Sequence, residues 1–321
     1  MKKNNYTIDN LRFLAIILVI LGHSIIIYNP YWNLVKTSAN SDLLKYLCWI
    51  IYIFHMPLFV FISGFLFNCN TSLFTLLKKK FKRLIIPYIL FSLFYLLPIR
   101  YILGYEGYVN NTLIYNIVDN IILGKDNGHL WFLPSLYIIF LLFYIILKKV
   151  KRLDWVLIIC FVISIIGLKI PYYFGNSLQY LFWFSFGYYV ANNLNTIKKI
   201  SNSKFVFIII FLLISIYVFI YGKFKFYNYI CIVLRYVINL FLLPLLYFAF
   251  SKYENSTFTK VSKYSFGMYL FHSPLVYFSF YSKYVNNPFL TLFINFFVFG
   301  GLSFLLSYLV SNSKLKFIVG K

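Results

Sequence analysis

The sequence predicts an all-α membrane protein with about ten transmembrane helices and both termini in the cytoplasm. The 321 residues are 62% hydrophobic and only 12% charged, and their mean hydropathy of +0.80 is far above that of a soluble domain. Apolar runs of about 18 to 23 residues, the length that crosses a bilayer, recur along the chain. Lysines and arginines are dense in every second connecting segment and sparse in the others. Together these observations indicate a polytopic helical membrane protein.

Ten apolar runs are the expected transmembrane helices. The first follows Lys2 and Lys3, as a signal peptide would, but no small-residue cleavage site comes after it, so we expect an uncleaved helix. No connecting segment is long enough to fold separately, so residues 1–321 are expected to form one transmembrane domain with no appended soluble domain. In chain order the expected spans are 9–29, 44–67, 84–103, 130–147, 153–170, 175–191, 205–221, 229–250, 264–281 and 288–310.

The net charge of +23 follows from the topology. With the N-terminus in the cytoplasm, 20 Lys and Arg residues fall in inner segments and seven in outer segments, as the positive-inside rule requires. We therefore expect a multi-pass protein of the cell membrane that has the lipid bilayer as a partner and binds no nucleic acid. The inner residues are Lys2, Lys3, Lys78, Lys79, Lys80, Lys82, Arg83, Lys148, Lys149, Lys151, Arg152, Lys198, Lys199, Lys204, Lys252, Lys260, Lys263, Lys314, Lys316 and Lys321, and the outer ones are Lys36, Lys45, Lys125, Lys169, Lys223, Lys225 and Lys283.

Three arginines fall within helices, and the cysteines form no pattern. Arg100 and Arg235 lie near the outer ends of their helices, where we expect their side chains to extend to water, whereas Arg12 lies near the inner boundary. The four cysteines have no paired spacing, so we expect neither a disulfide framework nor a metal site.

Two expected spans carry a histidine two residues before a proline, namely His55 in the second and His272 in the ninth. Each proline lacks an N–H and frees the carbonyl four residues earlier, which belongs to Ile53 or Leu270. Such a defect persists in a bilayer only where it faces protein or water. The repeated pattern favours a shared polar cavity, and the alternative is a pair of packing kinks with histidines nearby by chance.

Arg12 and His23 share one face of the first helix. They are eleven residues apart, which at 100° per residue places them within about 20° of each other with a rise of about 16 Å. Asp9 is placed to orient Arg12, and an interfacial anchor pair explains these two residues equally well. An ionisable group deep in a span is costly, so His23 marks a functional site by default.

A basic run, KKKFKR at 78–83, precedes the third span. Topology alone accounts for most such runs. Five cations within six residues are also suited to a phosphorylated cytosolic ligand, since arginine forms bidentate contacts with phosphate oxygens.

The fourth span begins with GHLWFLPSLY (128–137), which places His129 and Trp131 at the outer surface. For Trp131 the alternative is an interfacial aromatic belt, and for His129 an exposed polar residue. The preceding outer segment 104–129 holds three of the seven acids, so it is the first place to look for contact with a polar substrate. These acids are Glu106, Asp119 and Asp126.

Five segments in this order resemble the acyltransferase-3 family of integral membrane acyltransferases. The match extends over most of the chain. Residues 8–24 (IDNLRFLAIILVILGHS) resemble its first helix, in which an arginine or lysine is followed by a histidine. The other four segments are FHMPLFVFISGFLF (54–67), KFKRLIIPY (80–88), GHLWFLPSLY (128–137) and YSFGMYLFHSP (264–274).

The resemblance implies transfer of an acyl group, most often acetyl, from cytosolic acyl-coenzyme A to a hydroxyl of a glycan or lipid-linked sugar, with no permanently bound cofactor. It also implies that His23 is catalytic and that Lys80 and Arg83 contact the donor. Lys80 stands where the family pattern has arginine, so it keeps the charge but loses the bidentate geometry.

A donor path along the first helix fits this activity. Asp9 and Arg12, with Lys80 and Arg83, are expected to hold the donor at the inner face while its pantetheine arm extends toward His23. We expect an acceptor pocket near His23, lined by His55, His129, Trp131 and His272.

Several alternatives remain open from the sequence. His23 can act as a general base toward the sugar hydroxyl or become acylated itself. The donor can be succinyl rather than acetyl-coenzyme A (acetyl-CoA). A glycan or lipid transporter that uses the second and ninth helices as a gate is the main rival class, and a non-catalytic scaffold is the weaker one.

Overall fold

The computed structural model describes residues 6–30, 39–201, 204–224, 229–280 and 286–321, and within these ranges helices are the only regular elements. Lys2, Lys3, Lys36, Lys225 and Lys283, which enter the charge count above, lie outside the described residues. The α-helices are α1 (Tyr6–Ile25), α2 (Asp42–Phe65), α3 (Leu73–Lys80), α4 (Ile86–Phe91), α5 (Leu97–Ile102), α6 (Glu106–Val109), α7 (Leu113–Tyr115), α8 (Phe132–Lys149), α9 (Leu153–Gly167), α10 (Tyr172–Asn192), α11 (Leu194–Ser201), α12 (Lys204–Phe224), α13 (Tyr229–Phe250), α14 (Ser256–Ser262), α15 (Ser265–Phe280), α16 (Pro288–Phe293) and α17 (Gly300–Ser311).

Shorter 3₁₀ and π-helical turns join several of these helices. The 3₁₀ turns are η1 (Ile26–Tyr28), η5 (Gly128–Trp131) and η8 (Lys314–Val319). The π-helical turns are η2 (Phe81–Ile85), η3 (Ser92–Leu96), η4 (Asn116–Ile122) and η7 (Ile294–Phe299).

Seven helical segments of the described chain are long and apolar enough to cross a membrane. They are Tyr6–Tyr28, Asp42–Phe65, Leu73–Ile102, Gly128–Lys149, Phe205–Phe224, Tyr229–Phe250 and Pro288–Ser311. The three other expected spans are also helical, but α9 and α15 have only 15 and 16 residues, and the 21-residue α10 is rich in Tyr, Asn and Gly. The all-helical membrane fold is confirmed, while the count of ten spans and the sides of the termini stay predictions.

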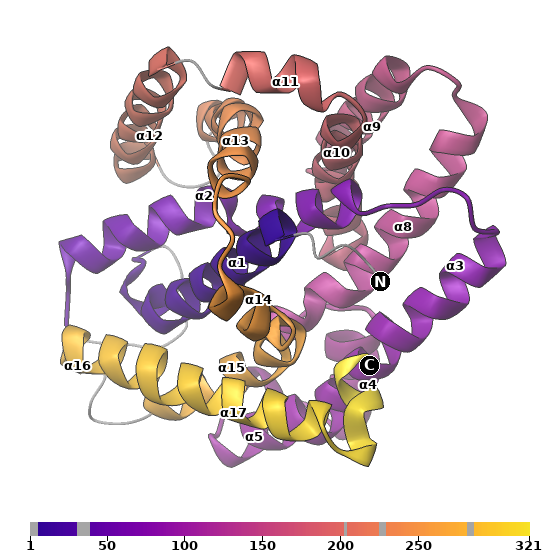
Figure 1. The fold of residues 1–321 in the computed structure, drawn as a ribbon. Coiled ribbons are helices and arrows are strands. Elements are labelled where there is room, and N and C mark those ends of the chain that lie inside the picture. The colour runs from indigo at the N-terminus through magenta and orange to yellow at the C-terminus, as the bar shows by residue number, and fades with distance from the viewer. Residues whose placement is uncertain (1–5, 31–38, 202–203, 225–228, 281–285) are drawn as a thin grey trace.

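Helix α1 lies in the middle of the bundle (Figure 1), where it contacts α2, α13, α14, α15 and α16. Its central position follows from its sequence, because apolar side chains occur all round it. Leu11, Ala15 and Ile16 have no exposed surface at all. A helix that is buried on most sides can hold a polar side chain only where a partner or a cavity receives it.

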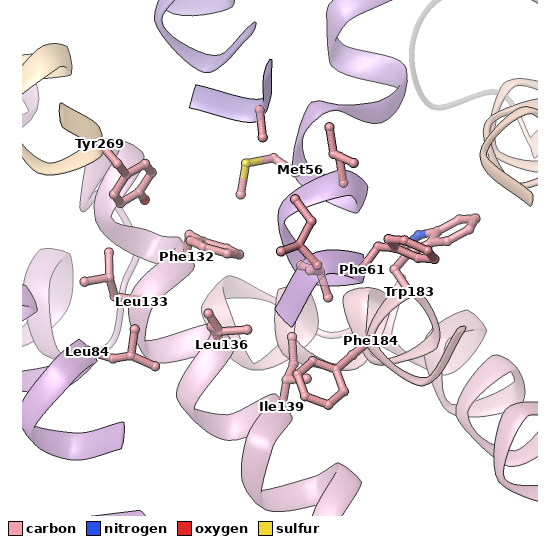
Figure 2. Packing of buried hydrophobic residues seen from close by; sticks show 14 of the residues in the cluster. Met56, Phe61, Leu84, Phe132, Leu133, Leu136, Ile139, Trp183, Phe184 and Tyr269 are labelled. Atoms are coloured by element: carbon pink, nitrogen blue, oxygen red, sulfur yellow. The ribbon is translucent and has the colours of Figure 1, made fainter. Parts of the chain in front are cut away.

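Helices α2 and α10 pack closely because glycines face each other's backbone. A Cβ atom on Gly64 of α2 would lie 1.9 Å from the carbonyl oxygen of Phe184, and one on Gly187 of α10 would lie 2.1 Å from that of Phe61. Small residues permit such close approach between membrane helices. Figure 2 shows Phe61 and Phe184 in the core beside this contact. The contact sets the separation of α2 and α10.

The third span is one continuous helical segment, Leu73–Ile102, that contains two π-helical turns. Each π-helical turn ends two residues before a proline, at Pro87 and Pro98. Since a proline cannot donate the usual i→i−4 bond, the ladder shifts to i→i−5 bonds just before it, from Ile86 to Phe81 and from Leu97 to Ser92. The helix starts before residue 84, the expected start, and includes the basic run 78–83.

Both carbonyls freed by the kink prolines have side-chain partners. Nδ2 of Asn239 donates to the Ile53 carbonyl at 2.9 Å, and Nε2 of His129 lies 3.2 Å from the Leu270 carbonyl. Asn239 lies on α13 and His129 at the start of the fourth span, so each kink is tied to a different element. The backbone defects therefore face protein, as a bilayer requires.

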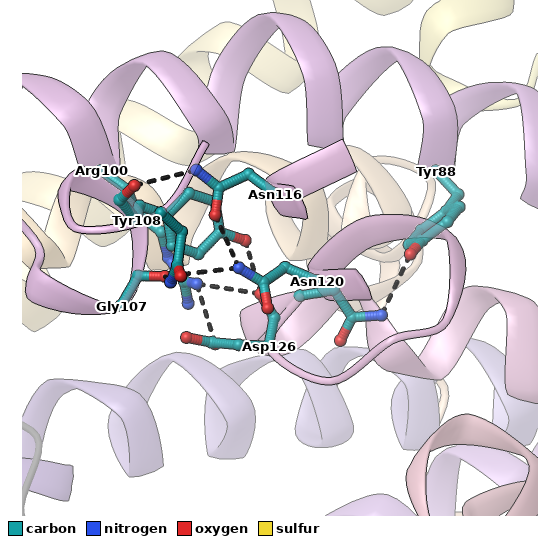
Figure 3. Close-up of polar contacts among 9 residues, drawn as sticks. Tyr88, Arg100, Gly107, Tyr108, Asn116, Asn120 and Asp126 are labelled. Carbon is teal, nitrogen blue, oxygen red and sulfur yellow. Dashed lines mark hydrogen bonds and ion pairs between the residues drawn. The ribbon is translucent and has the colours of Figure 1, made fainter. Parts of the chain in front are cut away.

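The outer segment 104–129 is folded into short helices rather than an open loop. A chain of amide bonds holds it: Asn120 donates to the side chain of Asn116 at 2.8 Å, and Asn116 donates to the Tyr108 carbonyl at 2.9 Å (Figure 3). Asn127 donates to the Tyr88 hydroxyl at 3.1 Å, which ties the end of the segment to α4.

The glycine contact between α2 and α10 gives a stability prediction. Gly187→Leu inserts atoms where a Cβ is already only 2.1 Å from a backbone oxygen, so the two helices must separate. We expect a loss of about 3 kcal/mol of stability, measured as a lower thermal midpoint in detergent. Gly301→Leu is the matched control because no heavy atom lies within 4 Å of its Cβ position. Equal midpoints for the two variants would contradict the packing argument.

Candidate functional site

A cavity of about 310 Å³ opens beside the C-terminal part of α1. Three of the four histidines of the chain line it, and the fourth, His272, is hydrogen-bonded to one of them. The two His–Pro kinks therefore do face one shared polar cavity, as the repeated pattern predicts. The lining residues are Val19, His23, Ile26, Tyr52, His55, Met56, Arg100, Tyr105, Asp126, Gly128, His129, Trp131, Tyr180, Arg235, Tyr269, Ser273, Val276, Tyr277 and Phe280.

His23 and His272 form a directed pair. Nδ1 of His23 lies 2.8 Å from Nε2 of His272, and Nδ1 of His272 lies 2.8 Å from the carbonyl oxygen of Tyr269. A carbonyl only accepts, so His272 carries its proton on Nδ1 and, as a neutral ring, presents an acceptor at Nε2. His23 must then donate from Nδ1, which leaves the lone pair on its own Nε2. His23 is half-buried whereas His272 is fully buried, so it is His23 that meets the cavity.

His55 and His129 are fixed by backbone carbonyls in the same way. Nδ1 of His55 donates to the carbonyl of Ile51 at 2.9 Å, four residues earlier on α2. Nε2 of His129 donates to the Leu270 carbonyl, and the ring of His129 lies 6.4 Å from that of His23, centroid to centroid. Both rings are buried and line the cavity, so His129 is not the exposed polar residue that was its alternative.

Trp131 also lines the cavity, at the end of η5. Its ring packs against Tyr180 of α10 with a centroid separation of 5.5 Å and an interplanar angle of 32°. Trp131 thus contributes an aromatic surface to the pocket. The structure places it inside the protein, in contact with another helix, and not only in an interfacial belt.

Arg100 lines the cavity, so the expectation that its side chain extends to water was wrong. It is 4% exposed, and its Nη1 lies 2.8 Å from Oδ1 of Asp126 and donates to the Asp126 carbonyl at 3.0 Å (Figure 3). The guanidinium lies over the rings of Tyr105 and Tyr108, each 4.6 Å away. Arg100 stays inside because an acid and aromatic faces receive its charge, so extension to water is unnecessary.

The acid-bearing outer segment thus contributes to the site through Asp126 and Tyr105. Burial, together with the neighbouring carboxylate of Asp126, raises the pKa of Tyr105 to about 12. Its phenol is therefore protonated at neutral pH and donates to Asp126. Arg100, Asp126, Tyr105 and Arg235 were not among the predicted site residues. The general cost of a charge inside a span, applied to His23, also flags Arg100 and Arg235.

A second group of residues gathers at the N-terminal end of α1. Arg12 lies 3.4 Å from Asp9, and its charge is close enough to Lys80 and Arg83 of the third span for mutual repulsion. Nζ of Lys80 lies 3.6 Å from the centroid of Phe140 on α8. The structure thus brings together the four residues predicted to bind the donor, and they form a basic cluster with one acid.

Buried side chains fill the face of α1 that runs from the basic cluster to the cavity. Ile16 and Val19 lie on this face between Arg12 and His23, and each is at most 1% exposed. The cavity reaches Val19 but no further toward Arg12 along the described lining. The expected track along the helix is therefore filled by side chains in this conformation.

No group of three or more His, Cys, Asp or Glu residues in the described part of the chain has a geometry that can hold a metal ion. Several nitrogens of the four histidines are hydrogen-bonded to one another or to backbone carbonyls.

Comparison with known proteins assigns the chain to a family. A family model described as an acyltransferase domain, of the acyltransferase-3 type, matches residues 5–312. No curated protein and no solved structure matches the chain. The match covers both the basic cluster and all four histidines, so the chain belongs to the acyltransferase-3 family and is a multi-pass membrane acyltransferase.

Proposed function

We propose that the protein transfers an acetyl group from acetyl-CoA to a hydroxyl of a surface polysaccharide or of a lipid-linked sugar. The observation that carries this proposal is the hydrogen bond from Nδ1 of His23 to His272, which leaves a basic Nε2 on a ring that meets the cavity. Family membership supplies the acyl chemistry. The cavity volume of about 310 Å³ is at the small end of the range for ligand pockets and suits one sugar unit.

In this reaction Nε2 of His23 takes the proton of the sugar hydroxyl as its oxygen attacks the thioester carbonyl. The bond from carbonyl carbon to sulfur then breaks, and the proton passes from His23 to the departing thiolate. His272 stabilises the imidazolium of His23 because Nε2 of His272 accepts a hydrogen bond from the protonated Nδ1 of His23. The same lone pair suits the alternative in which His23 attacks the thioester and carries the acyl group before the sugar does.

The basic cluster supplies the donor end of the proposed site. The phosphates of coenzyme A are multiply charged, and Arg12 and Arg83 offer bidentate donors on surfaces that stay partly exposed. With the N-terminus in the cytoplasm, this cluster faces cytosolic acetyl-CoA and the cavity faces the outer side. The rise of about 16 Å between Arg12 and His23 suits an extended pantetheine arm. Ile16 and Val19 must move aside for the arm to pass, so donor binding is coupled to a change around α1.

The catalytic role of His23 is tested by His23→Ala. Removing the general base is expected to lower acyl transfer by about 10²- to 10⁴-fold, measured as acetyl groups on surface glycans and as release of coenzyme A by the purified protein. Elution as a single species in size-exclusion chromatography serves as the folding control. Full acetylation by the variant overturns the assignment, and loss of glycan export with acetylation intact favours the transporter alternative.

The role of His272 is tested by two substitutions, each of which places an amide group at the position of a different ring nitrogen. The amide of His272→Gln reaches the Nε2 position and can accept from His23, whereas that of His272→Asn reaches only the Nδ1 position. We expect His272→Asn to lose about 10²-fold or more in kcat because His23 loses its orientation, and His272→Gln to retain more activity. Equal losses in the two folded variants would contradict tautomer control.

The basic cluster is tested by donor kinetics. Arg12→Ala and Arg83→Ala are each expected to raise KM for acetyl-CoA about tenfold with little change in kcat, since each removes a charge-assisted contact with phosphate. The effect should shrink at high salt. Lys79→Ala is the matched control, because Lys79 belongs to the same basic run but not to the cluster of Asp9, Arg12, Lys80 and Arg83. Unchanged KM values in the arginine variants would remove the cluster from donor binding.

A further inference from the structure

Two polar atoms in the cavity wall lack a hydrogen-bond partner within the described part of the chain. They are Nε of Arg100 and Nδ1 of His129. The side chains are 4% and 6% exposed, so bulk water does not replace a partner. A buried polar atom without a partner costs free energy, and a wall that keeps two of them is built for a ligand that pairs with them.

The two atoms have opposite hydrogen-bonding character. Nε of Arg100 always carries a hydrogen and is a donor. His129 donates to the Leu270 carbonyl from Nε2, so its neutral ring presents a lone pair at Nδ1, which is an acceptor. A ligand group that meets both atoms must accept one hydrogen bond and donate another.

The two side chains lie near each other and near the proposed base. The charge of Arg100 acts on His129, and a Cβ on the intervening Gly128 would lie 3.0 Å from Nη2 of Arg100. The ring of His129 is also edge-on to that of His23, with centroids 6.4 Å apart. The unpaired atoms therefore belong to residues that line the same cavity as His23, the proposed base.

We infer that the cavity binds a second hydroxyl of the acceptor, adjacent to the reacting one, between Nε of Arg100 and Nδ1 of His129. A hydroxyl accepts and donates at once, whereas a carbonyl or carboxylate oxygen can only accept and an ammonium can only donate. The acceptor class is therefore a neighbouring diol of a saccharide rather than an isolated alcohol. This inference rests on the proposed function and assigns Arg100 and His129 as specificity-determining residues.

The test compares diols with their monodeoxy analogues. Purified protein in detergent receives acetyl-CoA or succinyl-CoA together with methyl glycopyranosides of glucose, galactose or mannose, or with each monodeoxy derivative. Product is measured by mass spectrometry and coenzyme A release. For the glycoside that is acylated, removal of the hydroxyl next to the acylated one is expected to lower kcat/KM about 10- to 100-fold, because both wall atoms are left unpaired.

Substitutions of His129 test whether this residue causes the preference for the diol over the deoxy analogue. His129→Gln places an amide at the Nε2 position, so it keeps the donor to the Leu270 carbonyl and removes the acceptor at Nδ1. It should lower the ratio of kcat/KM for the diol to kcat/KM for the deoxy analogue from about 10- to 100-fold to near one. His129→Asn, which places an amide oxygen near the Nδ1 position, should keep more of the preference.

The outcomes separate the inference from the proposed function. Equal use of diol and deoxy analogue by the wild type, or a full preference for the diol in folded His129→Gln, overturns the inference and leaves the acyltransferase proposal standing. Absence of transfer to every acceptor from either donor overturns both. If His129→Gln does not fold, the wild-type comparison of diol and deoxy analogue decides alone.

Discussion

The candidate site depends on one constraint, which is that a backbone carbonyl inside a membrane must have a hydrogen-bond partner. Pro57 and Pro274 each free a carbonyl, and a side chain from another element pairs with it. Asn239 donates to the Ile53 carbonyl, and His129 donates to the Leu270 carbonyl. The same bond that pairs the Leu270 carbonyl holds His129 at the cavity. The stability of the kink and the geometry of the candidate site therefore depend on one interaction, and a substitution that disturbs the kink also displaces a cavity residue.

The two kinks share a further device that sequence inspection only partly anticipates. In both, Nδ1 of the histidine before the proline lies within hydrogen-bond distance of the carbonyl four residues earlier, at Ile51 for His55 and at Met268 for His272. Nδ1 of His272 is shared between this carbonyl and the closer one of Tyr269. This local bond is possible because both residues lie on one helix turn, so it can be predicted from the His-x-Pro pattern. Its consequence is that each ring presents Nε2 as an acceptor, and for His272 this acceptor receives His23.

The spacing of Arg12 and His23 and the all-helical membrane fold were accessible from the sequence because they depend on helix periodicity and length, whereas the count of ten spans stays a prediction. The pairing of Arg100 with Asp126 was not, because it joins a helix to a segment whose fold is set by amides of Asn116 and Asn120. The bond between His129 and the Leu270 carbonyl could not be predicted either, because the two residues are 141 positions apart in the sequence. The extension of the third span across the basic run was missed because the lysines lower its hydropathy, although their long side chains are compatible with a helix end.

The placement of Lys80 bears on its departure from the arginine of the family pattern. Its Nζ lies over the face of Phe140, a contact that needs a compact charge and makes no use of a planar fork. Arg12 and Arg83 remain partly exposed beside it, so two guanidiniums are available for phosphate oxygens even with lysine at position 80. In the proposed reaction Lys80 then raises the local positive potential while the arginines make the directional contacts. Lysine at position 80 is therefore compatible with donor binding, because the directional contacts come from Arg12 and Arg83.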